Sequence, residues 1–134
     1  GRPIDVFNHG NMVRDFTNDG DIVEGVKRAM DRVAVSDPMW NSDHPTPASS
    51  FAPYRVYNIG NSRPTQLMDY IHALEKNLGV QGVYNMMPMQ PGDVPSTCAD
   101  VSRLERDLGY RPKVMVEEGV AEFVKWYQVF YKIL

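Results

Sequence analysis

The 134-residue sequence contains a single cysteine, Cys98, so a framework of internal disulfides is excluded and a reducing compartment is favoured. No apolar run approaches the roughly 18 residues that a membrane span needs, and we expect no signal peptide. The net charge of −3 gives no electrostatic reason to expect nucleic acid or an anionic membrane as a partner. We therefore expect a cytoplasmic protein without either of those partners.

The sequence also lacks the side-chain groupings that most catalytic centres need. His9, His44 and His72 are far apart in the chain, so we expect no metal site. There is no G-x-S-x-G motif, and Cys98 has no obvious histidine neighbour, which favours an incidental thiol over a nucleophile. No Gly-rich turn joins the first expected strand to a helix, which excludes a dinucleotide site of the usual kind. We expect no complete catalytic apparatus.

What is present is an ordinary globular composition, with 43% hydrophobic and 23% charged residues. That balance and this length favour one domain, residues 1–134, around a single core. The sequence opens on Gly1 rather than Met, which fits a fragment boundary at least as well as a natural start.

Residue periodicity predicts alternating strands and helices, and hence an α/β fold. About four short strands are too few for a complete Rossmann sheet, so we expect a small mixed domain of four strands and four helices. The expected strands cover residues 4–7, 12–17, 54–59 and 83–87, and the expected helices cover residues 22–33, 62–78, 100–108 and 116–134.

Local signals predict where these helices begin and end, and which sides they bury. Asp21 and Glu24 have capping-box spacing before the first helix, Asp100 is a cap for the third, and Gly79 and Gly109 are stop signals. We expect the first helix to bury Ile22, Val23, Val26, Met30 and Val33, and the last to bury Val120, Phe123, Val124, Tyr127 and Tyr131.

Residues 36–53 hold four prolines and predict a long loop within the domain. Connections of about 4–6 residues are typical of compact domains. A lid, a crossover and a tolerated insertion all fit the pattern.

Several short strings occur in a fixed order along nearly the whole chain. They resemble the C-terminal, substrate-binding part of the NAD-dependent sugar-nucleotide epimerase/dehydratase family, the extended short-chain dehydrogenases. The Met-Gln-Pro-Gly-Asp-Val string and the Pro-rich loop most resemble UDP-glucuronate 4-epimerases. Each string alone is weak, and the ordered set carries the resemblance. The strings are residues 1–10, 14–17, 21–25, 53–61, 67–71, 88–95, 97–100, 107–112, 116–120 and 126–127.

This resemblance implies roles for two groups of residues in binding a UDP-sugar. Arg14 matches the arginine that binds the diphosphate, which suits a guanidinium fork; an ion pair with Asp15 is the alternative. Asp93 matches an acid that fixes the ribose, and Gln90 lies where many relatives place an arginine that binds phosphate. A plain Pro-Gly-Asp turn remains an alternative for this segment.

The same resemblance implies that the strand from Asp5 to Phe7 reads the edge of the uracil with its backbone. Phe7 would then lie beside the base, while an ordinary edge strand is the alternative. The chain departs from the family at Asn18-Asp19-Gly20, where an aromatic and an aliphatic residue are usual, and at Cys98, where an aromatic is usual.

The family's NAD loop and its Tyr-x-x-x-Lys pair have no match in this sequence, so we expect the chain to bind no NAD and to be inactive by itself. NAD would serve the full-length family enzyme, in which it oxidises and reduces the sugar at C4. The chain could instead be the same portion of a UDP-sugar dehydratase or decarboxylase, or a non-catalytic binding module. We also expect a homo-oligomer, because the methionine-rich residues 86–89 and the expected strand 54–59 would otherwise expose apolar surface.

Overall fold

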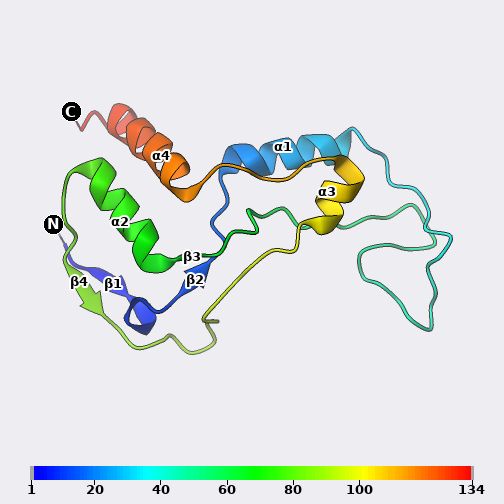
Figure 1. Cartoon of the computed structure of the whole chain (residues 1–134), viewed down its shortest axis with the longest axis horizontal. Coiled ribbons are helices and arrows are strands. Elements are labelled where there is room, and N and C mark those ends of the chain that lie inside the picture. The colour runs from blue at the N-terminus through cyan, green and yellow to red at the C-terminus, as the bar shows by residue number, and fades with distance from the viewer. Residues whose placement is uncertain (1, 134) are drawn as a thin grey trace.

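The computed structural model describes residues 2–133 and shows a mixed α/β arrangement (Figure 1). This confirms the expected fold class, with four α-helices and a few two- or three-residue strands within the described residues. In chain order the elements are β1 (Ile4–Val6), a 3-10 turn η1 (Phe7–Gly10), β2 (Val13–Arg14), α1 (Asp19–Met30), β3 (Thr65–Gln66), α2 (Leu67–Leu78), β4 (Tyr84–Met86), α3 (Ser102–Leu108) and α4 (Val116–Tyr131).

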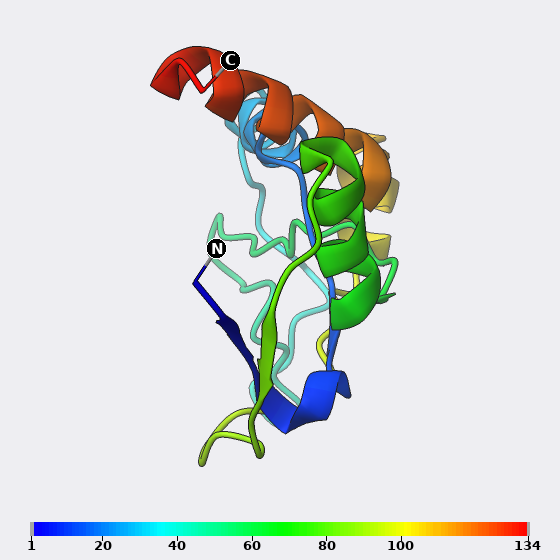
Figure 2. The ribbon, with the colours of Figure 1, turned by 90° about the vertical axis from the view of Figure 1, so that its left-hand side faces the viewer.

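The strands form two separate pairs. β1 and β4 are parallel, with Asp5 opposite Asn85, and they lie side by side in Figures 1 and 2. β2 and β3 are antiparallel, with Val13 opposite Gln66. Backbone bonds extend the first pair beyond the strands, because the His9 N–H donates to the Met87 carbonyl at 3.0 Å.

The core divides into two clusters. The first joins α2 to α4 through Ala73, Val120 and Val124, and these two helices pack together in Figure 2. The second surrounds Leu104 of α3, which is fully buried, and includes Tyr110. The first cluster thus ties α2 to α4, and the second lies around α3, which also contacts α1.

The predicted strand at residues 54–59 is wrong. Its only ladder contact is an isolated bridge between Arg55 and Ser49, because no described segment lies beside it in an extended register. The predicted strand 12–17 is shorter in the structure, where it covers Val13–Arg14 and pairs with β3. The residues of β3 were expected to begin a helix. Residues 36–53 form a loop without helix or strand, as predicted.

The expected cap of α1 is also wrong. Asn18 is the N-cap, and its side chain accepts a hydrogen bond from the Gly20 N–H at 2.8 Å. Asp21 lies inside the helix and is buried. By contrast, α2 and α3 end as predicted, at Gly79 and Gly109, which both adopt the left-handed conformation. The N-cap of α3 is Val101 rather than the expected Asp100. The Asp100 side chain still accepts a hydrogen bond from the N–H of Ser102, the first residue of α3, at 2.9 Å.

Two helical faces that were expected to be buried are exposed. On α1, Val23 and Met30 are 65% and 78% exposed. On α4, Val120 and Val124 are buried as predicted, but Phe123 is 49% exposed. Each of these helices therefore carries an apolar face that no described residue covers. Within residues 2–133 no helix is both long and apolar enough to cross a membrane.

Candidate functional site

An ion pair joins two of the residues singled out from the sequence. The Nη2 of Arg14, at the end of β2, lies 2.9 Å from the Oδ1 of Asp93. The Nη1 of Arg14 donates to the carbonyl of Val13 at 2.9 Å. Both side chains of the pair are partly exposed, and a guanidinium has five N–H donors. Arg14 can therefore keep its ion pair with Asp93 and still donate hydrogen bonds to a ligand.

A tight turn sets the position of the Asp93 carboxylate. The Asp93 N–H donates to the carbonyl of Gln90 at 3.2 Å, and Gly92 supplies the positive φ of 85° that this turn requires. The Val94 N–H donates to Asp93 Oδ1 at 2.7 Å. The Pro-Gly-Asp turn thus holds an acid against Arg14, and it places Gln90 in the same turn.

Asp5 and Phe7 occupy a neighbouring part of the structure. Asn85 of β4 donates from its side chain to Asp5 Oδ1 at 2.9 Å. β1 ends at Val6, one residue short of the expected strand, and Phe7 begins the 3-10 turn. The structure brings Arg14, Asp93 and Gln90 together, but it shows no direct contact between that group and Asp5 or Phe7 among the described residues.

The two groups are joined through the chain that leaves β4. The Met87 N–H donates to the carbonyl of Val6 at 2.9 Å, and the chain then continues through Gln90 to Asp93. Figure 2 shows the 3-10 turn and this loop at the same end of the molecule. A ligand that spanned both groups would lie along this end.

Asp15, the neighbour of Arg14, was considered only as its possible ion partner, yet it has a different role. Its Oδ2 accepts from the backbone N–H groups of Ser62 and Ala99, at 3.0 and 2.9 Å. The segment after β2 is thereby tied to two distant parts of the chain, which fixes the base of the Arg14 side chain. No sequence signal we used pointed to this role.

A second acid, Asp21, was mistaken for a cap and is the centre of a buried network. Its Oδ1 accepts from the Tyr110 hydroxyl at 2.8 Å, and its Oδ2 accepts from the N–H groups of Lys113 and Val114 at 3.0 and 2.9 Å. Burial alone would raise the pKa of Asp21, but the hydrogen bonds from Val114, Tyr110 and Lys113 outweigh it and lower the pKa below 3.8. Burial and then the bond to Asp21 raise the pKa of Tyr110 to about 12. This network locks α1 to the chain before α4.

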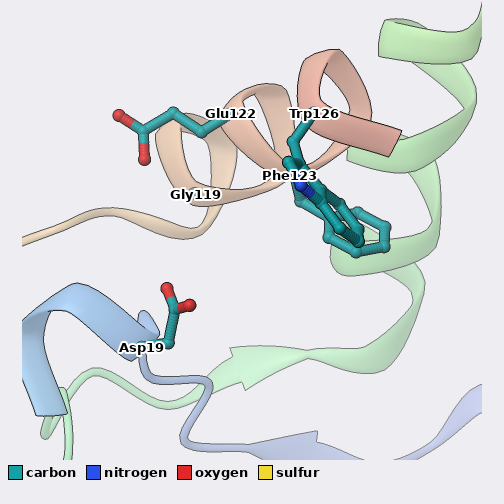
Figure 3. Close-up of a pocket in the computed structure, with 5 residues that line it drawn as sticks. All are labelled: Asp19, Gly119, Glu122, Phe123 and Trp126. Carbon is teal, nitrogen blue, oxygen red and sulfur yellow. The ribbon is translucent and has the colours of Figure 1, made fainter. Parts of the chain in front are cut away.

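The hollow drawn in Figure 3 has a volume of about 380 Å³ and lies between α4 and the start of α1. Phe123 and Trp126 lie side by side there, with ring centroids 5.8 Å apart. Asp19 lines it from α1, while the Glu122 side chain is directed away from the two rings. The hollow is apolar and lacks the convergent polar groups of an active site. Among residues 2–133, no group of three or more acids, histidines and cysteines could hold a metal ion.

Residues 3–123 match the family described as GDP-mannose 4,6 dehydratase. The chain belongs to this family. It is 51% identical over 133 residues to an uncharacterised 37.6 kDa protein of Escherichia coli O111:H-. It is 44% identical over 136 residues to a probable UDP-glucuronate 4-epimerase of Rhizobium meliloti.

These family members are much longer than the chain. The alignments cover 99% and 98% of the chain but only 40% and 39% of the two relatives. A UDP-glucuronic acid 4-epimerase variant of Bacillus cereus, solved with UDP-4-deoxy-4-fluoro-glucuronic acid and NAD, matches with a TM-score of 0.74 at 25% identity. That match covers 97% of this chain and 36% of the other. The predicted kinship with NAD-dependent epimerases and dehydratases is confirmed.

The described residues of this family member do not form a cradle for NAD. A dinucleotide site needs a Gly-rich turn that leads from a strand into the N-terminus of a helix. Here β1 leads into a 3-10 turn, in which Asn8 and His9 have positive φ angles of 51° and 50°.

Proposed function

We propose that this chain is the nucleotide-sugar-binding portion of a UDP-glucuronate 4-epimerase-like enzyme and that it holds a UDP-hexuronate. The observation that carries the proposal is the Arg14–Asp93 pair, a partly exposed guanidinium held by an acid from a tight turn. The remaining N–H donors of Arg14 suit diphosphate oxygens, which match a guanidinium in charge and spacing. The 44% identity to the probable UDP-glucuronate 4-epimerase supports the choice of sugar nucleotide.

In this proposal Asp93 has two tasks. Its Oδ1 orients Arg14, and its Oδ2, which has no partner among the described residues, accepts a hydrogen bond from a ribose hydroxyl. Asp5 and Phe7 lie along the end of the molecule where the base would extend, with Phe7 available to contact its face. Gln90 provides an uncharged amide beside the phosphates. The chain supplies binding and orientation, and no proton or hydride transfer is assigned to its residues.

Replacing Arg14 by alanine is expected to abolish measurable UDP binding. We expect the unchanged chain to bind UDP with a dissociation constant between the high micromolar and millimolar ranges, about −4 to −6 kcal/mol. Loss of charge-assisted hydrogen bonds, worth roughly 1.5–3 kcal/mol each, would weaken UDP binding at least about tenfold. Isothermal titration of UDP into each variant measures the effect.

Arg103→Ala is the matched control, because it removes the same charge from α3 and should leave UDP affinity unchanged. A parallel titration with GDP tests the base, and we expect weaker binding than with UDP. Equal UDP binding by Arg14→Ala and Arg103→Ala would contradict the phosphate role of Arg14. Tighter binding of GDP than UDP would contradict the proposed substrate.

A further inference from the structure

A short segment of the loop after β4 lies along one edge of β2. The Val13 N–H donates to the carbonyl of Pro95 at 2.9 Å, and the Thr97 N–H donates to the carbonyl of Val13 at 3.2 Å. The two bonds make a parallel bridge between Val13 and Ser96, while β3 pairs with the other edge of β2. The backbone that carries Arg14 is therefore held from both sides.

Thr97 bonds to the chain on both sides of Arg14. In addition to the bond from its N–H to the Val13 carbonyl, its Oγ1 accepts from the Asp15 N–H at 3.3 Å. The same Val13 carbonyl accepts from Nη1 of Arg14 at 2.9 Å, so the oxygen that Thr97 holds also anchors the guanidinium. Thr97 thus fixes the two neighbours of Arg14, and within residues 2–133 it makes no hydrogen bond to the guanidinium itself.

The segment that ends at Thr97 begins at the acid of the ion pair. Asp93 Oδ1 lies 2.9 Å from Nη2 of Arg14, and the chain runs from Asp93 through Pro95 to Thr97. The ion pair at one end and the Thr97 bonds at the other close a ring of residues that includes Val13 and Arg14. Such a ring orients the guanidinium before a ligand arrives, and preorganised groups lose less freedom on binding.

The bond to the Thr97 hydroxyl is a surface contact rather than part of the core. Thr97 is exposed, and neither core cluster includes it. Water can therefore satisfy the Asp15 N–H when the hydroxyl is removed, while the Asp15 side chain keeps its bonds to Ser62 and Ala99. Loss of the hydroxyl is thus expected to alter the position of Arg14 more than the stability of the fold.

We propose that Thr97 is a positioning residue that holds the Arg14 guanidinium against Asp93, in the orientation that receives the diphosphate of a nucleotide sugar. The role toward the diphosphate rests on the proposed function, whereas the orientation of Arg14 is a property of the free chain. Thr97 itself is assigned no contact with the ligand. Its hydroxyl acts through the Asp15 N–H, and its own N–H acts through the Val13 carbonyl.

Thr97→Val removes the hydroxyl and keeps the branched shape of the side chain, and it is expected to raise the dissociation constant for UDP about fivefold, the effect of one lost hydrogen bond. Thr97→Ser keeps the hydroxyl and should bind UDP as the unchanged chain does. Thr46→Val is the matched control, because the Thr46 Oγ1 likewise accepts from a backbone N–H, that of Ala48 at 3.4 Å, in the loop of residues 36–53. Isothermal titration measures the affinities, and circular dichroism checks the fold of each variant.

The side-chain Nε–H of Arg14 reports the order of the guanidinium without any ligand. In the ¹⁵N-labelled chain its signal is assigned by its absence from Arg14→Ala, and its nuclear Overhauser effect measures how rigidly the side chain is held. We expect a rigid Nε–H in the unchanged chain and in Thr97→Ser, and a more mobile one in Thr97→Val. The Nε–H of Arg28, which donates to Glu24 on α1, should be the same in all three.

The two measurements separate the positioning role from the nucleotide site. If the unchanged chain binds no UDP, a mobile Arg14 in Thr97→Val would support the positioning role and count against the nucleotide site. An Arg14 that stays equally rigid in Thr97→Val would overturn the positioning role, and UDP binding by the unchanged chain would still leave the nucleotide site standing. A loss of affinity that Thr97→Ser shares, or that Thr46→Val reproduces, would also overturn the positioning role.

Discussion

Asp21→Ala is expected to lower the free energy of unfolding by about 3 kcal/mol. The substitution leaves the N–H groups of Lys113 and Val114 and the hydroxyl of Tyr110 without their acceptor, and each buried unpaired group costs roughly 1–3 kcal/mol. Relaxation and entry of water at the edge of the network recover part of that cost. Asp21→Asn keeps one acceptor oxygen and should cost about 2 kcal/mol. Urea unfolding followed by circular dichroism measures both.

The effect of Asp21 should depend on pH in one direction. Its pKa in the folded chain lies below 3.8, the value expected in the unfolded chain. A lowered pKa means that the ionised form stabilises the fold, so this contribution is complete above that pH and disappears as the pH falls through the folded value. The difference between the unchanged chain and Asp21→Asn should therefore be constant near neutrality and shrink below about pH 4.

Asp31→Ala is the matched control, because Asp31 caps the other end of α1 and its side chain accepts no hydrogen bond from the described residues. Its unfolding midpoint should stay close to that of the unchanged chain. If Asp21→Ala and Asp31→Ala unfold at the same urea concentration, then the network around Asp21 contributes little, and our account of how α1 is held would be wrong.

Gly60→Ala should also destabilise the chain strongly, by about 2–3 kcal/mol, the upper part of the range for overpacking. A methyl group on Gly60 would lie 2.4 Å from the Cβ of Ala99 and 3.0 Å from the Oδ2 of Asp15. The backbone near Ala99 must move to make room, and Asp15 would lose its bonds to Ser62 and Ala99. Thermal unfolding measures the loss.

Gly119→Ala is the comparison for Gly60→Ala, since its nearest contact would be an ordinary 3.4 Å to Asn18. Within a helix alanine is favoured over glycine by about 1 kcal/mol, so Gly119→Ala should unfold no earlier than the unchanged chain. An equally mild effect of Gly60→Ala would contradict the close approach of the two segments.

Helix positions followed from the sequence where local signals decide them. α2 and α3 end at Gly79 and Gly109 because glycine adopts without strain the left-handed conformation that closes these two helices. The strand at residues 54–59 could not be judged this way, because a strand requires a neighbour that local sequence does not supply. Likewise, the periodicity of α1 identifies its apolar face. It does not tell whether another part of the chain packs against that face and covers Val23 and Met30.

The site was predictable in part. Arg14 and Asp93 are far apart in the sequence, and only the ordered family strings suggested that both serve one ligand. The ion pair between them follows from the parallel bridge of Val13 with Ser96 and from the turn at Gly92, which no periodicity reveals. Asp21 was misjudged because an acid near a helix start is usually a cap, and Asp15 was expected only as an ion partner of Arg14. The long-range backbone partners of both acids appear only in the fold.

Chemical-shift mapping of UDP binding on the ¹⁵N-labelled chain tests the central claim most directly, because it locates the ligand. We expect UDP, raised to about 10 mM to saturate a weak site, to shift the amide signals of residues 5–7, 13–14 and 90–94. The signals of α4 beyond Phe123 should stay in place. Shifts centred on the aromatic hollow of α4, or no shifts at all, would contradict a nucleotide site built on Arg14 and Asp93.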